Sequence, residues 1–188
     1  MLLRGSWGRA GLYRFYQHRN ASTNIHGPIA ASDTLTQLKS VFQAFASRCT
    51  DVETPQSNLP AHMKSDIVPR FLEQLHEVEP RTRRASHAMY AWRVRCSLQS
   101  SASTSFLCGS PNGGEAGAGE RLERLLELGR FENVIVVVFR WYGGVKLGSN
   151  RWKCISSVAK DALDRGRFLP GADEGQHFEG SSRKGRRR

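Results

Sequence analysis

The chain has 188 residues, of which 39% are hydrophobic and 24% charged, and its formal net charge is +11. This length corresponds to one domain plus tails at roughly 100–200 residues per domain, and no apolar run approaches the roughly 18 residues of a membrane span, so we expect no membrane partner. The charge favours acidic partners such as nucleic acid or an acidic protein face, although nine of the cations lie within residues 4–19 and 183–188.

The N-terminal segment and the cysteines bear on the compartment. Residues 1–22 contain arginine but no acidic residue, which is typical of a mitochondrial transit peptide; a basic tail or a misassigned start codon gives the same composition. The four cysteines form no C-x-x-C pair, so we expect free thiols in a reducing compartment and no metal site; they are Cys49, Cys96, Cys108 and Cys154. We therefore expect a cytoplasmic protein, with the mitochondrion as the alternative.

Hydrophobic periodicity predicts alternating strands and helices over residues 39–169, between a basic, irregular segment in 1–38 and a disordered basic tail in 170–188. The predicted elements are a strand in 39–50, a helix in 65–78, a strand in 85–98, a helix from about 120 to 129, a strand in 133–142 and a helix from 149 or 150. A short extra strand is expected at 106–108, within the Ser- and Gly-rich loop after Leu98. This order predicts an α+β fold in which helices pack on a small sheet.

The two later strands differ in their pattern. The strand in 85–98 alternates, so we expect it to be half-buried, with a polar face that carries His87, Arg93 and Arg95. That basic strip is consistent with phosphate contacts, or with an ordinary solvated sheet face. The strand in 133–142 is apolar without a break, so we expect both of its faces to be covered.

The helices carry their own signals. Ser65 or Asp66 is expected to cap the first helix, with Pro69 in its first turn. The buried stripe of the second helix is expected to include leucines up to Leu128, and Gly129 is expected to end that helix.

The segment "RWYGGVKLGSNRWK", residues 140–153, joins the apolar strand to the last helix. Its spacing is neither that of a Walker loop nor that of G-x-G-x-x-G. Glycines, cations and a helix N-terminus permit an anion site, a nucleic-acid surface, a protein-docking site or a simple turn with solvated cations. Trp141 is the aromatic residue that we expect to be exposed, whereas Trp152 lies on the core stripe of its helix.

Catalytic constellations are absent from the sequence pattern. His87 follows Ser86, but no aspartate is placed to complete a triad, and Glu115 stands alone in a Gly-rich loop. We therefore expect no enzyme activity and no cofactor.

Several blocks resemble consecutive blocks of the IMPACT family, in its Impact N-terminal-type domain. They are "KSVFQAFASRCTD", "RRASHAMYAWRVR", "NGGEAGAGERLERLLEL" and "NVIVVVFRWYGGVKLGSNRWKCISSVAKDAL". The resemblance implies a fold like the second domain of a small-subunit ribosomal protein, with β-α-β units and a left-handed crossover. It also implies a partner- or anion-binding motif, which we assign to Arg140, Tyr142, Gly143, Gly144, Lys146, Gly148 and Arg151.

The resemblance implies a role in translation. Its best understood members compete for the activator of the amino-acid-starvation kinase that phosphorylates an initiation factor, and a separate RWD domain carries much of that binding. Residues 1–38 are too short and polar to form an RWD domain. The expected partner is a kinase activator or a ribosome-associated factor, with nucleic acid as the alternative.

One turn departs from the family pattern. The family has an acidic "D-D-G-E" before the second helix, and this chain has Asn112, Gly113, Gly114 and Glu115. Both aspartates are replaced, so Glu115 is the acid that remains. His87, Arg93, Arg95 and Glu115 complete the predicted surface.

Overall fold

The computed structural model describes residues 15–16, 28–49, 61, 63–97 and 104–168. Apart from residues 15–16, the predicted transit peptide lies outside the described residues, as do residues 50–60 and the predicted tail from residue 170. No helix among the described residues is long and apolar enough to cross a membrane. The strands are β1 Phe15–Tyr16, β2 Ile29–Ala31, β3 Leu35–Gln37, β4 Ser40–Arg48, β5 His87–Ser97, β6 Thr104–Gly109 and β7 Val134–Trp141. The α-helices are α2 Val68–Val78, α3 Ala118–Leu128 and α4 Asn150–Arg165, with a π-helical turn at Met63–Ile67 and a 3-10 turn at Pro80–Arg84.

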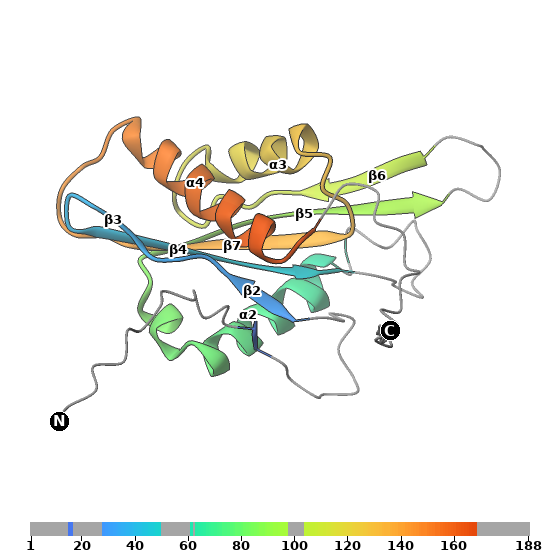
Figure 1. Cartoon of the computed structure of the whole chain (residues 1–188), viewed down its shortest axis with the longest axis horizontal. Coiled ribbons are helices and arrows are strands. Elements are labelled where there is room, and N and C mark those ends of the chain that lie inside the picture. The colour runs from blue at the N-terminus through green and yellow to red at the C-terminus, as the bar shows by residue number, and fades with distance from the viewer. Residues whose placement is uncertain (1–14, 17–27, 50–60, 62, 98–103, 169–188) are drawn as a thin grey trace, which may run out of the picture.

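The described strands form one antiparallel sheet in the order β1-β2-β4-β7-β5-β6, and β3 pairs with the N-terminal part of β4. β7 lies between β4 and β5, with Val137 opposite Phe45 on one side and opposite Tyr90 on the other. β6 is the extra strand expected around 106–108, paired with β5. The α+β class, a small sheet with helices packed on it, is confirmed (Figure 1).

Helices cover both faces of the sheet. α3 and α4 pack on the face that presents Ala44, Met89 and Val136, whereas α2 packs on the face that presents Phe45 and Val137. Figure 1 shows α3 and α4 above the sheet and α2 below it. Every residue from Val134 to Arg140 is buried, which confirms the prediction that the apolar strand is covered on both faces.

Two connections join parallel strands that flank an antiparallel one. α2 joins β4 to β5 across β7, and α3 joins β6 to β7 across β5. In the second connection the strands run in the opposite direction, and the chain also moves across the sheet in the opposite direction. These two reversals cancel, so two connections of the same handedness would place their helices on the same face of the sheet. Because α2 and α3 lie on opposite faces, one connection must be left-handed, against the general right-handed rule. The topology thus requires the left-handed crossover that the resemblance implies.

The irregular backbone predicted for residues 1–38 is wrong over β2 and β3. Ala30 pairs with Ala46, and the Ser32 hydroxyl accepts a hydrogen bond from the Ala44 N–H at 2.9 Å. Ile29 is fully buried. Three-residue strands are too short to show a period, which is why the pattern missed them.

The connection between β2 and β3 is also tied to α4. Arg165 Nη1 donates to Asp33 Oδ1 at 3.0 Å, and the Asp33 N–H donates to Asp161 Oδ2 at 2.9 Å. The hydrogen bond from Arg165 lowers the pKa of Asp33 from its ordinary value. These contacts join residues before Lys39 to the last helix of the domain.

The half-buried state predicted for the strand in 85–98 is also wrong. Met89 and Ala91 share a face with His87 and Arg93, yet both are fully buried under α3. Small and polar residues on that face produce a pattern that normally indicates one buried face and one solvent-exposed face. In the structure, however, α3 covers the middle of the strand.

Two helix details differ from the predictions. Residues 63–67 continue the helix backwards as a π-helical turn, so Ile67 precedes α2 and no side chain caps it. Leu128 is 70% exposed, because it falls in the last turn of α3 and outside the buried stripe. Pro69 in the first turn and Gly129 at the end of α3 lie where the sequence predicts them.

We expect Cys49 to resist alkylation in the folded protein. Its thiol is fully buried, with Sγ 3.8 Å from Met63 Sδ, and burial raises its pKa to about 12. The reactive thiolate is therefore scarce at pH 8. Iodoacetamide labelling followed by peptide mass spectrometry should leave Cys49 unmodified in buffer and modify it in urea, with exposed Cys108 as the native-state reference. Labelling of Cys49 in buffer to the same extent as in urea would contradict the burial.

Candidate functional site

The loop between β7 and α4 packs against the turn between β3 and β4. A side chain at Gly143 would place its Cβ 2.1 Å from the carbonyl carbon of Lys39, so only glycine fits there. The Gly143 N–H donates to the Ser40 hydroxyl at 3.2 Å. Gly144 adopts a φ of 83°, which also favours glycine. Gly143 thus allows two distant segments to pack closely at one end of the sheet, on the left of Figure 1.

The β3–β4 turn has an unfavourable sequence for its shape. Gln37 pairs with Ser40, so the turn has two central residues, Leu38 and Lys39, with φ of 44° and 65°. Such turns favour Asn-Gly, and each non-glycine residue in this region costs on the order of 1 kcal/mol. The turn nevertheless holds Leu38 in solvent, with 54% of its surface exposed. Strained backbone of this kind is often found at ligand-contacting and switch regions.

Exposed apolar side chains gather on these two loops. Among the described residues four large hydrophobic side chains are exposed, and three of them are Leu38, Tyr142 and Val145. Lys39 and Lys146 are exposed beside them in the sequence. We call these five residues the sheet-end surface. Grouped exposed apolar residues are a common feature of surfaces that contact other macromolecules.

Behind this surface lies a buried ion-pair network centred on Glu115. Glu115 is 7% exposed and Arg140 4%. Arg140 Nη1 donates to Glu115 Oε2, Arg151 Nε lies 2.9 Å from Oε1 without the angle of a hydrogen bond, and His87 Nε2 lies 3.8 Å from Oε2. One carboxylate therefore contacts two guanidinium groups and a histidine.

Arg140 also supports the exposed tyrosine. Its guanidinium carbon lies 5.2 Å from the centre of the Tyr142 ring and 5.4 Å from that of Phe42. The Tyr142 N–H donates to the Ser86 hydroxyl at 3.0 Å. Cation–π contacts of this kind fix the position of a ring. Arg140 thus supports the Tyr142 ring from a buried position, whereas Tyr142 itself is exposed to solvent.

The predicted binding motif therefore divides into two groups. Tyr142 and Lys146 are exposed, while Arg140 is buried and Arg151 is half-buried, with Nη1 donating to the Gly148 carbonyl at 3.2 Å. The glycines shape the loop. Binding of a partner by the motif stays a prediction.

The departure at residues 112–115 preserves the helix start. The Asn112 side-chain oxygen accepts a hydrogen bond from the Gly119 N–H at 2.7 Å, in the first turn of α3. Asparagine thus satisfies a free N–H of that turn, as an aspartate could. His87 Nδ1 lies 3.3 Å from the Gly113 carbonyl oxygen. Glu115 then remains as the acid of the buried network. Sequence reasoning named this glutamate but missed its central role; the signal was a single acid facing a motif rich in arginine.

The basic strip of β5 is not a continuous cationic face. Arg93 Nη1 donates to the Phe131 carbonyl at 3.1 Å, and its guanidinium carbon lies 3.6 Å from the centre of the Phe106 ring. Arg95 Nε donates to Glu132 Oε2 at 2.9 Å. His87 lies apart from both, at the Glu115 network. Internal partners therefore engage each of the three residues.

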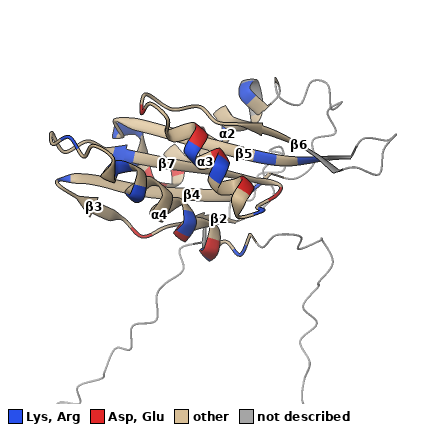
Figure 2. Cartoon of the chain, turned by 90° about the horizontal axis from the view of Figure 1, so that it is seen from above, with Lys and Arg blue, Asp and Glu red and all other residues tan. Residues whose placement is uncertain are grey.

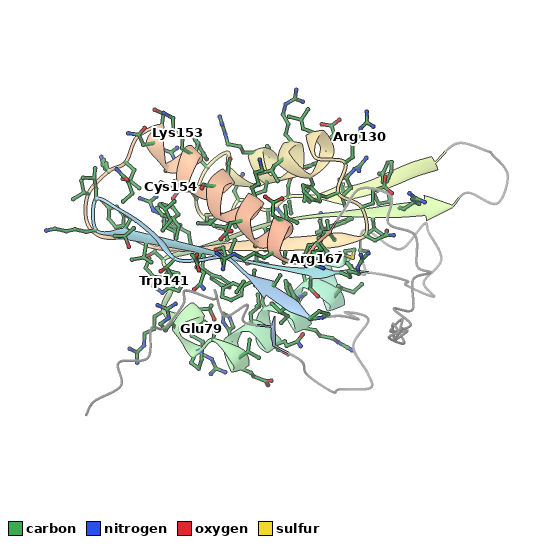
Figure 3. All side chains as sticks on the ribbon, in the orientation of Figure 1. Glu79, Arg130, Trp141, Lys153, Cys154 and Arg167 are labelled. Carbon is green, nitrogen blue, oxygen red and sulfur yellow. The ribbon has the colours of Figure 1, made fainter. Side chains whose placement is uncertain are left out.

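Trp141 lies at the same end of the sheet, on the side of α2 (Figure 3). It is half-buried, its Nε1 donates to the Arg81 carbonyl at 3.1 Å, and the Arg81 guanidinium carbon lies 5.4 Å from its ring centre. It lines a pocket of about 490 Å³ together with Val41, Pro80, Arg81 and Arg84. Trp152, as expected, packs against the core.

The described residues hold no group of three or more His, Cys, Asp or Glu side chains that could bind a metal. The arrangement at the sheet end places an exposed apolar surface in front of a buried ion-pair network. Such a site has the chemistry of macromolecular contact.

Residues 38–163 match the Impact N-terminal domain, and this range includes the Glu115 network and all five residues of the sheet-end surface. The chain belongs to this family. As an Impact N-terminal domain protein it is 36% identical to the Protein IMPACT homolog of Saccharomyces cerevisiae, over 73% of this chain and 46% of the relative. It is 33% identical to Protein IMPACT of Rattus norvegicus, over 78% of this chain and 41% of the relative.

A shorter relative of this Impact N-terminal domain protein is matched over most of its own length. This IMPACT family member of Saccharomyces cerevisiae is 34% identical, over 74% of this chain and 92% of the relative. A solved structure of the two-domain translational regulator Yih1 is 31% identical, with a TM-score of 0.42, over 80% of this chain and 53% of that chain. The chain spans about half the length of the first relatives.

Proposed function

We propose that this protein is a non-catalytic regulator of translation that acts by protein contact, within signalling by the amino-acid-starvation kinase. The observation that carries the proposal is the sheet-end surface, where Leu38, Tyr142 and Val145 are exposed together. Apolar side chains of this kind bind a protein face better than they bind phosphates. The proposal extends to this chain the role that the family resemblance implies.

Several arginine side chains bind groups of the domain itself, which supports the same proposal. Arg140, Arg151 and Arg95 each contact a carboxylate of the domain, and Arg93 stacks on Phe106. Phosphate binding needs cations that are available to the ligand. On the sheet-end surface, the cations available to a phosphate are Lys39 and Lys146. Two cations are few for a phosphate-binding face.

The alternative is a nucleic-acid- or ribosome-binding module. One observation favours it: the pocket at Trp141 combines a half-buried aromatic ring with Arg81 and Arg84. Rings beside arginines stack on unpaired bases in single-strand binders. Binding of that kind should weaken steeply with salt.

Affinity purification of the C-terminally tagged protein, with half of the sample treated with RNase, separates the two functions. We expect a translation factor to survive RNase treatment and to be recovered about tenfold less with Val145→Asp, because an acidic group opposes burial of the surface. Lys64→Asp places the same acidic side chain at an exposed position in the turn before α2 and changes the net charge by one unit more, so it is a stringent control and should leave recovery unchanged. Loss of all partners after RNase would instead support the alternative.

A second readout tests the pathway. Deleting the gene should raise phosphorylation of the initiation factor during amino-acid starvation, and re-expression of Val145→Asp should not reverse the increase. Unchanged phosphorylation in the deletion strain would contradict a role in kinase signalling. Whether the protein acts by protein contact would still be decided by the affinity purification.

A further inference from the structure

A groove runs between α3 and α4, on the face away from the sheet. Its volume is about 840 Å³. Its lining comes from both helices and from the turn after α3, and consists of Gly117, Glu120, Arg121, Arg124, Leu125, Leu128, Gly129, Phe131, Ser156 and Lys160. Figure 2 looks onto this helical layer. The groove lies outside the sheet-end surface, with which it shares no residue.

The floor of the groove is apolar. Leu125 and Phe131 are partly buried against the core beneath the helices, and Leu128 is 70% exposed. Leu128 is the fourth exposed large hydrophobic side chain of the described residues, and the one that lies outside the sheet-end surface. A hydrophobic side chain exposed to this extent, beside a groove with an apolar floor, gains stability when a partner covers it.

The rim of the groove is positively charged. Arg121, Arg124 and Lys160 are exposed along it. The acid among the lining residues is Glu120, whose Oε1 accepts a hydrogen bond from the Asn112 side chain at 3.3 Å. Arg124 lies 3.7 Å from Glu127, but both side chains are about two-thirds exposed, and such surface pairs contribute little. The rim therefore presents more positive than negative charge to a ligand.

The spacing on α3 matches helix recognition. Arg121, Arg124, Leu125 and Leu128 lie at relative positions 0, 3, 4 and 7, which share one face of a helix. On α4, Ser156 and Lys160 are four residues apart and line the facing wall. Two helices with a continuous apolar floor between them form the kind of groove that accepts a third helix.

We propose that this groove binds an amphipathic helix of a protein partner, with apolar residues on one face and carboxylates flanking them. The apolar face covers Leu125, Leu128 and Phe131, and the carboxylates pair with Arg121, Arg124 and Lys160. The floor favours a protein over nucleic acid, because Leu125, Leu128 and Phe131 offer no hydrogen-bonding group to the edges of bases. Charge complementarity thus selects an acidic helix over a basic one.

Fluorescence anisotropy with two labelled helical peptides of identical apolar stripe, one with glutamates and one with lysines flanking it, tests the proposal on the full chain. We expect the glutamate peptide to bind at least about tenfold more tightly than the lysine peptide, and less tightly as salt increases. Leu128→Asp and Arg124→Glu should each weaken it by about tenfold. Leu38→Asp, an equivalent change on the sheet-end surface, should leave binding unchanged.

Amide chemical-shift mapping of the unmodified protein with the glutamate peptide provides a readout that needs no variant. The shifts should concentrate in residues 120–131 and 156–160. Equal affinity for the two peptides, undiminished binding to Leu128→Asp, or shifts at the sheet-end surface would overturn the proposal. So would a dimer of the protein that Leu128→Asp dissociates, since a second copy would then occupy the groove. If no partner bound the sheet-end surface, binding of the peptide to this groove would be unaffected. The proposed function and the proposed groove can therefore fail independently of each other.

Discussion

Replacing Glu115 with glutamine is expected to lower the free energy of unfolding by about 3–5 kcal/mol, the range found when one partner of a buried ion pair is removed. Glu115 is 7% exposed and contacts Arg140, which is 4% exposed. Without the carboxylate, the Arg140 guanidinium keeps its charge in a buried position, where it has no solvent to replace the lost partner. Arg151 and His87 lose their contact with the same carboxylate. Urea unfolding followed by circular dichroism measures the change.

The matched control for this variant is Glu127→Gln. Its side chain is 64% exposed and lies 3.7 Å from Arg124, so the change should stay within about 0.5 kcal/mol. The double variant Glu115→Leu with Arg140→Met removes both charges and should be more stable than Glu115→Gln alone. A Glu115→Gln protein that unfolds at the same urea concentration as its parent would show that the network does not support the domain.

Removing residues 1–38 is expected to destabilise the domain by at least about 3 kcal/mol, since the truncation uncovers apolar surface and breaks backbone pairing. The lost residues include Ile29, which is fully buried, and the strands β2 and β3, which pair with β4. They also include Asp33, whose hydrogen bonds reach α4. A truncated chain that begins at residue 39 should therefore unfold at a lower urea concentration and expose the edge of β4.

A chain that begins at residue 28 is the control for this truncation. It loses the two-residue strand β1, which pairs with β2, but keeps β2 and β3 with their contacts to β4 and α4. It should therefore unfold within about 1 kcal/mol of the full chain. Equal stability of the two truncated chains would mean that the domain starts at Lys39, where the sequence pattern first predicts a strand.

The long elements of this fold could be predicted because their patterns are strong. The run from Val134 to Phe139 indicated a strand covered on both faces, and leucines at helical spacing located α3. β2 and β3 could not be found in the same way, since a three-residue strand owes its existence to its partner β4. The cover over Met89 and Ala91 was also missed, because alternation records polarity and not the presence of a helix above the strand.

The candidate site was only partly readable from the sequence. Arg140 and Arg151 stood out as cations in a glycine-rich loop, but their common partner, Glu115, is 25 residues away from Arg140 in the chain. Which cations are engaged inside the fold depends on this long-range pairing. Leu38 gave no signal at all, because an isolated leucine in a polar segment becomes informative only when its turn is seen beside Val145 and Tyr142.

The central position of β7 constrains how a nascent chain can fold. β7 begins at Val134, after every other described strand, yet it separates β4 from β5. Until residue 141 leaves the ribosome, β4 and β5 lack the strand that joins them, and their edges stay open to other chains. Long-range pairings of this kind slow folding. The sheet is therefore completed late in synthesis, when β7 inserts between the unpaired edges of β4 and β5.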